Sequence, residues 1–344
     1  MRRLAVVVAA AVSAVLATAS VAGACGSLVG PNGAVQLLRT STLVAYHDGL
    51  EHYVTNFEFA GDQPSFGSII PLPAEPTKVE RGGDWTLQRL QQEVAPPPKF
   101  AEDLAAVPPA AGASVEVLEQ VRIDSLDVTI LKGGGRSVAD WAATQGFTLT
   151  DDTPHVLEFY GRRSPYFMAA KFDAAAAVAQ GFTGGDGIPV HLTMPVDRPW
   201  VPLHILATGK AADEVVQADV FLLTDEKPRL LAGPGLALER SGPASRSLLA
   251  DLRSDQGMAW VPARSHLTYL RVDVAAGDLD YDLAATTNQT TVPTLRDTGL
   301  TSTADTVVPG GTDGSAIWPV VVAVATVLVL GGGLGVGLRR PRSG

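Results

Sequence analysis

Residues 65–90, SFGSIIPLPAEPTKVERGGDWTLQRL, decide how this part of the chain is expected to fold. An apolar run ends in prolines, which cannot donate to a sheet and therefore limit how far the strand pairs. The glycines at 82–83 turn the chain, and Asp84 is placed to cap a helix that begins at Trp85. Apolar residues then recur on one face of that helix, at Leu87, Leu90 and Val94. The stretch therefore predicts a structural role and not a functional site. It should form a strand, a turn and a helix that docks on strands.

The segments around this stretch favour a mixed fold. The alternation in 51–59, EHYVTNFEF, predicts a half-buried strand that places Tyr53, Thr55, Phe57 and Phe59 on one face. Apolar runs predict further strands at 190–196, 200–209, 218–225 and 267–274. Short helices are expected at Ser137–Gln145, Asp173–Gln180 and Ser245–Arg253. Strands and short helices without regular alternation indicate α+β, here a strand-rich extracytoplasmic body with several short helices.

Both ends of the chain resemble segments that direct a protein to a membrane or anchor it there. Residues 1–24 combine a basic start, an uncharged apolar run and small residues before Cys25, which is the pattern of a secretory signal peptide. Residues 316–338 carry no charge and, at about 1.5 Å per residue, are long enough to cross a bilayer core of about 30 Å. Arginines in the tail at 339–344 mark the cytoplasmic side. We therefore expect one C-terminal transmembrane helix, with the body outside the cell membrane and a short tail inside.

Composition divides the region between these ends. Residues 25–95 form a first strand-rich part of the ectodomain, 96–114 a Pro/Ala-rich loop, and 115–285 a second α+β part. Residues 286–315 are rich in threonine and glycine and predict a stalk. Within the expected membrane helix, Gly331 and Gly335 have the spacing that allows two helices to approach closely and would permit a homodimer; the alternative is a chance pairing in a glycine-rich run.

Composition also narrows the function classes. Cys25 is the only cysteine, so no disulfide can form within the chain, and it is free, lipidated or paired between chains. The formal net charge of −10 argues against nucleic acid as a partner. No complete cofactor motif occurs. The run Gly133–Gly135 lacks the third glycine and the lysine of phosphate-binding loops, and Ser137 is expected to cap a helix there instead. We expect no cofactor.

Two groups of residues are candidate metal ligands. Asp278, Asp280 and Asp282 alternate like the first ligands of a calcium loop, although the later positions of such a loop are not matched. The alternative is a strand whose aspartates all face water. His47 and His52 lie close together in YHDGLEHY, a composition that zinc can use. Their spacing is not that of a zinc helix, and Asp48-Gly49 between them is typical of a hairpin turn.

The segment 162–167, RRSPYF, supplies the candidate ligand-binding residues Arg162, Arg163 and Tyr166. Arginine and tyrosine are enriched where proteins contact partners, so the cluster could hold an acidic or sugar ligand. The alternative is a turn that enters the strand FMAAKF. No nucleophile motif such as G-x-S-x-G is present, and no residue is assigned a catalytic role.

Several separated blocks carry a family resemblance. FGSIIPLP…PTKVERGGDWTLQRL, SVADWAATQGF, SPYFMAAKFD, PWVPLHIL and LLADLRSDQGMAWVP together resemble a family of exported bacterial proteins, the domain of unknown function DUF2330. The likeness covers roughly residues 40–283. It implies an extracytoplasmic protein, often with a signal peptide, and carries no established activity or catalytic residues.

These observations favour a membrane-anchored cell-surface protein that acts as a binding or assembly module on an unknown protein or envelope component. The alternatives are an extracytoplasmic hydrolase whose site is assembled from distant residues, and a divalent-cation-binding envelope protein. A pocket in which acidic and histidine side chains converge would favour the enzyme. Scattered charge beside an exposed apolar surface would favour the binding module.

Overall fold

The computed structural model describes residues 27–30, 33–34, 37–59, 65–94, 116–147, 149–173, 176, 179, 187–231, 233–288 and 290–300. The described residues lie in one compact unit, which ends at Thr301. The expected signal peptide, loop 96–114, membrane span and tail lie outside these ranges, as do Cys25, Gly331 and Gly335. Within the described ranges, no helix has the length and apolar character needed to cross a membrane.

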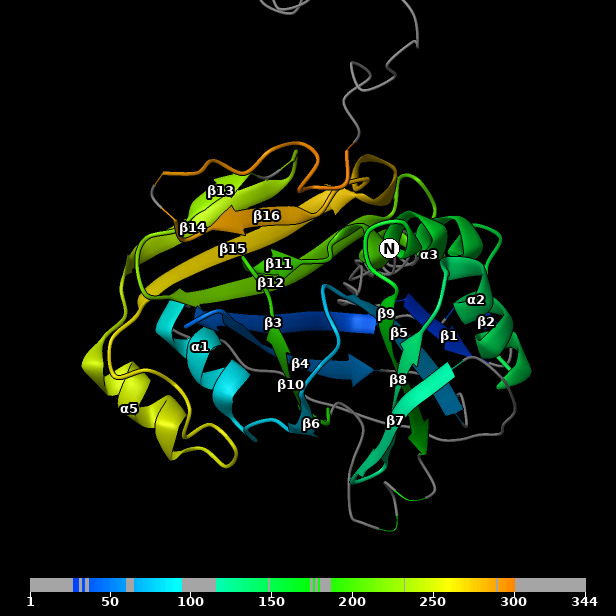
Figure 1. Ribbon diagram of the computed structural model, residues 1–344, viewed down its shortest axis with the longest axis horizontal. Coiled ribbons are helices and arrows are strands. Elements are labelled where there is room, and N and C mark those ends of the chain that lie inside the picture. Colours follow the sequence, from blue (N-terminus) through cyan, green and yellow to red (C-terminus); the bar gives the residue numbers. More distant parts are fainter. Residues whose placement is uncertain are drawn as a thin grey trace, which may run out of the picture. The chain divides into compact units, whose positions relative to one another are not determined.

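A seven-stranded sheet forms the centre of the body, in the order β14-β15-β12-β3-β4-β10-β6 (Figure 1). In that order its strands are Leu236–Pro243, His266–Ala275, Val215–Thr224, Leu37–His47, Leu50–Phe59, Val190–Pro195 and Lys78–Arg81. The pair β3–β12 is parallel, and the other neighbours are antiparallel. The turn between β3 and β4 holds Asp48 at φ 49° and Gly49 at φ 77°, which confirms the expected hairpin.

Two smaller sheets complete the strand-rich body. The six-stranded sheet β2-β1-β5-β9-β8-β7 consists of Gly33–Ala34, Ser27–Gly30, Ser65–Leu72, Tyr166–Asp173, Leu126–Lys132 and Glu116–Ile123. The three-stranded sheet β11-β16-β13 consists of Trp200–Val201, Leu283–Thr286 and Arg229–Leu231. The helices are α1 (Thr86–Val94), α2 (Gly135–Thr144), α3 (Thr153–Gly161) and α5 (Arg246–Ser254), with short 3-10 turns η1 (His204–Ala207) and η2 (Ala276–Asp278). The expected α+β class is confirmed.

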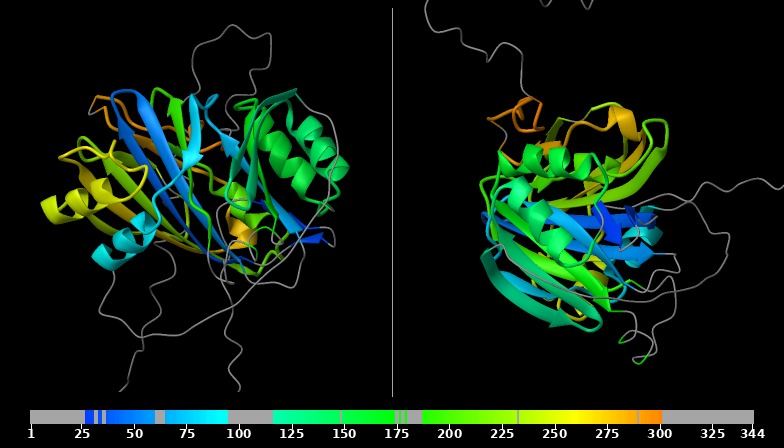
Figure 2. Two further views of the ribbon diagram at one scale, coloured as in Figure 1. Left: turned by 90° about the horizontal axis from the view of Figure 1, so that it is seen from below. Right: turned by 90° about the vertical axis from the view of Figure 1, so that its right-hand side faces the viewer.

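The central sheet is buried on both faces. Leu43 and Val54 pack in one core beneath α1 and α5, whereas their chain neighbours Val44 and Tyr53 pack in the other. Figure 2 shows α1 and α5 on one side of the body and α2 and α3 on the other. Residues 51–56 of the expected strand are therefore not half-buried, because both faces of the sheet are covered there.

Residues 65–90 form β5, β6 and α1, so their reading as scaffold agrees with the structure. The cap is different from the expected one. Asp84 pairs with Arg81, and the carboxylate of Asp255 accepts hydrogen bonds from the backbone N–H groups of Asp84 (3.1 Å) and Trp85 (3.0 Å). A side chain at Gly83 would meet that carboxylate at 2.3 Å. The glycine pair therefore makes room for a cap supplied by a distant residue.

Other expectations need correction. The run 200–209 forms the two-residue strand β11 followed by η1, because Pro202 interrupts it. The helix α3 was not expected from the sequence. The expected helix 173–180 lies almost entirely outside the described residues. The helix 245–253 is confirmed as α5, and Ser245 Oγ caps it by accepting from Leu248 N at 3.1 Å.

The glycine run before α2 allows α2 and α3 to pack closely. The helix begins at Gly135, so Ser137 lies within its first turn and does not cap it. A Cβ at Gly135 would lie 2.1 Å from the carbonyl carbon of Leu157, and one at Gly161 would lie 2.6 Å from Gly135 N. Glycine at these positions lets α2 and α3 approach backbone to backbone.

The part of the expected stalk that the structure describes lies on the body. Thr298 is buried, and its carbonyl accepts a hydrogen bond from Asp282 N at 2.9 Å. The compact body thus continues to the end of the described residues, beyond the boundary at 285 that composition indicated.

Candidate binding pocket and buried polar clusters

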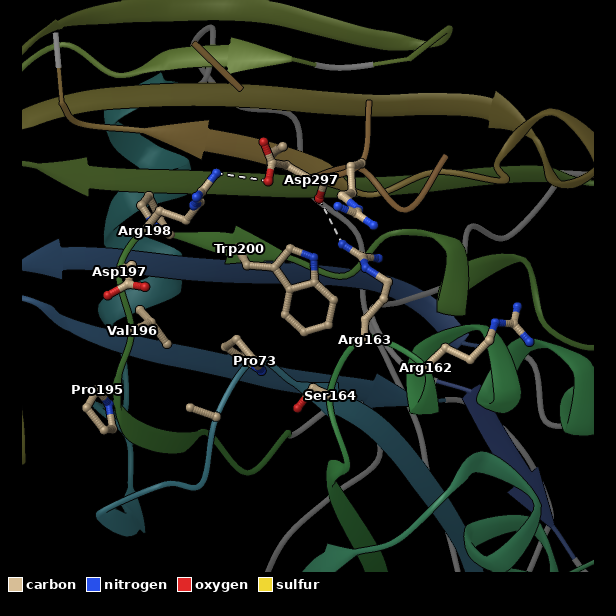
Figure 3. A pocket seen from close by; sticks show the side chains of 14 residues that line it. Pro73, Arg162, Arg163, Ser164, Pro195, Val196, Asp197, Arg198, Trp200 and Asp297 are labelled. Atoms are coloured by element: carbon tan, nitrogen blue, oxygen red, sulfur yellow. Dashed lines mark hydrogen bonds and ion pairs between the residues drawn. The ribbon is translucent and has the colours of Figure 1, made fainter. Parts of the chain in front are cut away.

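Loops from four parts of the chain, at 73–74, 162–164, 195–200 and 296–297, line a pocket of about 550 Å³ (Figure 3). One wall is apolar, with three prolines and Trp200 among its residues. The pocket is also lined by four arginines, Arg162, Arg163, Arg198 and Arg296, and by the acids Asp197 and Asp297. Cations therefore outnumber acids at this site in a chain whose formal net charge is −10.

Arg163 is held at the back of the pocket by a buried carboxylate. Its guanidinium forms an ion pair with Asp282, whose side chain is fully buried. Arg163 Nη2 also donates to the carbonyl of Asp297 at 2.8 Å. The guanidinium lies 5.0 Å from the ring centre of Trp200 and 5.3 Å from that of Phe159. These contacts fix its orientation.

Asp282 joins four segments of the fold. Its Oδ1 accepts hydrogen bonds from Tyr160 Oη at 2.7 Å, Leu203 N at 2.8 Å and His204 N at 3.2 Å. Burial, followed by the nearby negative charge of Asp282, raises the pKa of Tyr160 well above its usual value, so the phenol stays a donor. Burial lowers the pKa of His204, so the charge opposite Asp282 comes from Arg163.

Arg198 and Asp297 close another side of the pocket. Arg198 Nη1 lies 2.9 Å from Asp297 Oδ1. The other oxygen of Asp297 accepts from Thr294 N at 2.7 Å and Thr294 Oγ1 at 2.8 Å. Backbone and side-chain donation from Thr294, with the charges of Arg198 and Arg163, lowers the pKa of Asp297 despite its burial. Asp297 is therefore an ionised anchor for Arg198.

Arg162 and Arg296 differ from these paired arginines. Both are exposed, and within the described ranges neither forms an ion pair. Figure 3 shows Arg162 on the far side of Arg163 from Trp200. These two guanidinium groups are the pocket cations whose donors remain open to a ligand.

The sequence identified half of this arginine set. Arg162 and Arg163 line the pocket, but Tyr166 begins β9 outside it, with Lys132 Nζ 6.0 Å from its ring centre. Arg198 and Arg296 were missed. Each is an isolated arginine in a loop, and only the fold brings them beside 162–163.

A second fully buried carboxyl, that of Glu51 on β4, lies behind Trp200. Its Oε2 accepts from Trp200 N at 2.8 Å, while its Oε1 has no hydrogen-bond partner. Burial raises the pKa of Glu51 to about 8, and the Trp200 hydrogen bond offsets only part of that effect. Glu51 is therefore mostly protonated at neutral pH.

The aspartate triplet does not gather its three carboxylates. Asp278 and Asp280 are exposed, whereas Asp282 is buried against Arg163. The alternation expected for a water-facing strand fails because the chain makes the turn η2 at 276–278 and β16 starts only at Leu283. Asp282 thus neutralises a guanidinium, which leaves it poorly suited to bind a cation.

His47 and His52 lie apart, each with its own partners. His47 Nδ1 is 2.6 Å from Asp225 Oδ1, and His47 Nε2 is 3.2 Å from Asp48 Oδ2. These three exposed or half-exposed residues could supply one ligand atom each. These ligand atoms all lie within 4.8 Å of one another, but the side chains are exposed or half-exposed, and such acidic groups are common on protein surfaces without a metal ion.

His52 instead lies beside a histidine that the sequence left unassigned. His52 Nδ1 is 2.9 Å from His191 Nε2, and the ring of Trp260 stacks on His52 with centres 3.9 Å apart. Burial lowers the pKa of His52 to about 4 and that of His191 to about 3. Both rings are therefore neutral at physiological pH.

The described chain is thus a strand-rich α+β body that carries an arginine-lined pocket. The family model DUF2330, described as an uncharacterized protein conserved in bacteria, matches residues 19–227. The chain belongs to this family. The matched range includes Arg162, Arg163 and Arg198 and ends before Asp282 and Arg296.

Similarity to better-known proteins is slight. No curated protein matches the sequence. The crystal structure of baculovirus P35 shares 10% identity with the chain at a TM-score of 0.41, over 74% of this chain and 98% of that one. Likeness at this level carries no argument about the fold or the function.

Proposed function

We propose that the chain is a binding module that acts outside the membrane and takes, in the arginine-lined pocket, a ligand with an oxyanion group and an apolar body. The observation that carries this proposal is that four arginines, from three segments far apart in the chain, line one pocket of about 550 Å³. That volume lies in the range typical of small-molecule sites, roughly 300–1,000 Å³.

The chemistry of the lining supports this ligand class. A guanidinium matches the planar geometry of a carboxylate and also binds phosphate. Arg163 and Arg198 are oriented by acids, while Arg162 and Arg296 keep open donors. The apolar wall formed by Pro73, prolines in the 195–199 loop and Trp200 suits a nonpolar body next to the anion.

The pocket favours binding over the alternative of hydrolysis. Among the described residues that line it there is no histidine, and Ser164 Oγ accepts from Tyr166 N at 3.3 Å. A serine nucleophile is usually activated by an adjacent histidine, and the described lining offers none to Ser164. The proposed place outside the membrane rests on the signal-peptide pattern at 1–24 and the apolar span at 316–338.

Calorimetric titration of the full chain tests the proposal. The probes are N-acetylphenylalanine, its neutral amide, and inorganic phosphate. We expect the carboxylate to bind, the amide to bind at least tenfold more weakly, and phosphate to compete with the carboxylate, since each charge-assisted hydrogen bond contributes about 1.5–3 kcal/mol. Phosphate that binds more tightly than the carboxylate would identify a phosphorylated ligand.

The matched variants are Arg162→Gln with Arg296→Gln, and the control Arg136→Gln on the exposed side of α2. The double variant should lose at least tenfold in affinity, and the control should bind like the wild type. Equal binding of carboxylate and amide, or full affinity in the double variant, would overturn the proposal.

A further inference from the structure

A row of polar side chains crosses the face of the central sheet that also carries α1 and α5. His52 on β4 lies opposite Thr193 on β10, and His191 on β10 lies opposite Glu80 on β6. Residues directly opposite in antiparallel strands, and residues two apart on one strand, share a face. His52, His191, Thr193 and Glu80 therefore project from the same side of the sheet.

Three ligand-type atoms of this row lie at metal-site spacing. His52 Nδ1 and His191 Nε2 are 2.9 Å apart, and Thr193 Oγ1 is 3.5 Å from each of them. Two nitrogens bound to one zinc ion at about 2.1 Å each lie roughly 3.0–3.5 Å apart. The observed separations need only small side-chain shifts to admit an ion.

Glu80 provides an orienting group. Its Oε1 lies 3.2 Å from His191 Nδ1, although the angle does not meet hydrogen-bond geometry, so that nitrogen is without a hydrogen-bond partner in this arrangement. A metal-binding histidine commonly donates its second N–H to a carboxylate, which directs the lone pair of the other nitrogen toward the metal. Glu80 is placed to do this for His191 Nε2.

The surroundings also suit a metal ligand pair. Both rings lie inside the protein, His191 fully buried and His52 partly buried, which favours the neutral imidazole that binds metal. The ring of Trp260 covers His52 at an interplanar angle of 5°. The nearby Lys78 is exposed and lies 3.8 Å from Glu80, so its charge is directed to the same carboxylate.

We propose that His52, His191 and Thr193 form a site for a transition-metal ion of the zinc or copper(II) class, with Glu80 orienting His191. Imidazole nitrogens favour these ions over calcium and magnesium, which prefer oxygen ligands. Three protein ligands leave at least one coordination position for water or an external group. The site is separate from the arginine pocket and from His47.

The test uses the full chain without a histidine tag, stripped with a chelator and dialysed. Zinc chloride is titrated by calorimetry, and copper sulfate by quenching of tryptophan fluorescence. We expect one zinc ion per chain, no competition from calcium, and copper quenching that Trp260→Phe removes, because Trp260 stacks on a ligand ring.

Variants separate this site from its alternatives. His52→Ala should weaken zinc binding at least a hundredfold, and Glu80→Gln about tenfold, in line with the effect of orienting carboxylates. His191 is buried, so a His191→Ala variant could fail to fold. In that case Thr193→Val and Glu80→Gln still test the site. His155→Ala, an exposed histidine on α3, is the control and should leave binding unchanged.

Three outcomes would overturn the proposal. Stripped wild-type chain that binds no zinc would do so, as would unchanged affinity in His52→Ala. Loss of binding in His47→Ala alone would move the site to His47, Asp48 and Asp225.

Discussion

Two fully buried carboxyls, Asp282 and Glu51, lie close to Trp200. Asp282 forms an ion pair, whereas Glu51 is mostly protonated. Asp282 accepts from three neutral donors and pairs with Arg163. Glu51 accepts from one backbone N–H and has an unpartnered oxygen. Burial of a charge is costly unless it is paired and hydrogen-bonded. The difference teaches that the partners, and not the depth of burial, decide which carboxyl holds a charge in this fold.

Removal of charge from Asp282 should have the largest effect. Asp282→Asn leaves Arg163 without its buried partner, and loss of one member of such a pair typically costs about 3–5 kcal/mol. Denaturant unfolding of the full chain measures this loss. The control Asp280→Asn changes an exposed residue two positions away and should remain within about 0.5 kcal/mol of the wild type. Equal effects of the two variants would contradict the role given to Asp282.

Replacement of Glu51 by a neutral residue that cannot ionise should have the opposite sign. The raised pKa, about 8 against 4.5 unfolded, means that the fold favours the protonated carboxyl. That contribution to stability is fully present below pH 4.5 and is lost as the pH rises through 8, at about 1.4 kcal/mol per unit. Glu51→Gln should match the wild type near pH 4.5 and exceed it by about 3 kcal/mol at pH 7.

Unfolding free energies of Glu51→Gln and wild type, measured in a chelating buffer between pH 4.5 and 8, check this expectation. A constant difference over that range would show that Glu51 keeps its charge in the folded protein. The comparison with Asp282 would then fail.

Asp255 is a third buried carboxyl, which has several hydrogen-bond donors but no cation. Its replacement should have the smallest effect on stability. Its oxygens accept from backbone N–H groups and from Thr86 Oγ1 at 2.8 Å, with no cation among these partners. Asp255→Asn should therefore cost about 1–2 kcal/mol, the usual range for a helix cap. Thermal unfolding compared with Asp140→Asn, an exposed position on α2, provides the measurement. A cost as large as that of Asp282→Asn would mean that neutral donors hold a buried carboxylate as well as a guanidinium does.

Local patterns in the sequence predicted much of the fold. The hairpin at Asp48-Gly49, the docked α1 and the helix α5 all depend on neighbouring residues, and the structure contains each of them. The sequence could not show that β4 is buried on both faces or that Asp255 caps α1. Both depend on segments more than a hundred residues away in the chain.

The candidate sites were harder to predict from the sequence for the same reason. The paired arginines at 162–163 stand out locally, but Arg198 and Arg296 belong to separate loops. The aspartate triplet suggested one shared role, yet a turn at 276–278 separates its members. His52 was grouped with His47 by sequence spacing, whereas strand register places it beside His191.

The parallel pair of β3 and β12 has a consequence for how the chain acquires its fold. Thr40 of β3 lies opposite Ala218 of β12, so the middle of the sheet cannot close until most of the chain has been synthesised. Pairings between such distant segments form slowly. Until then the apolar strand β3, with Leu43 and Val44 on opposite faces, presents an open edge that can pair with other chains. Chains shortened before Val215 should therefore aggregate, and the full-length chain depends on rapid completion of this sheet.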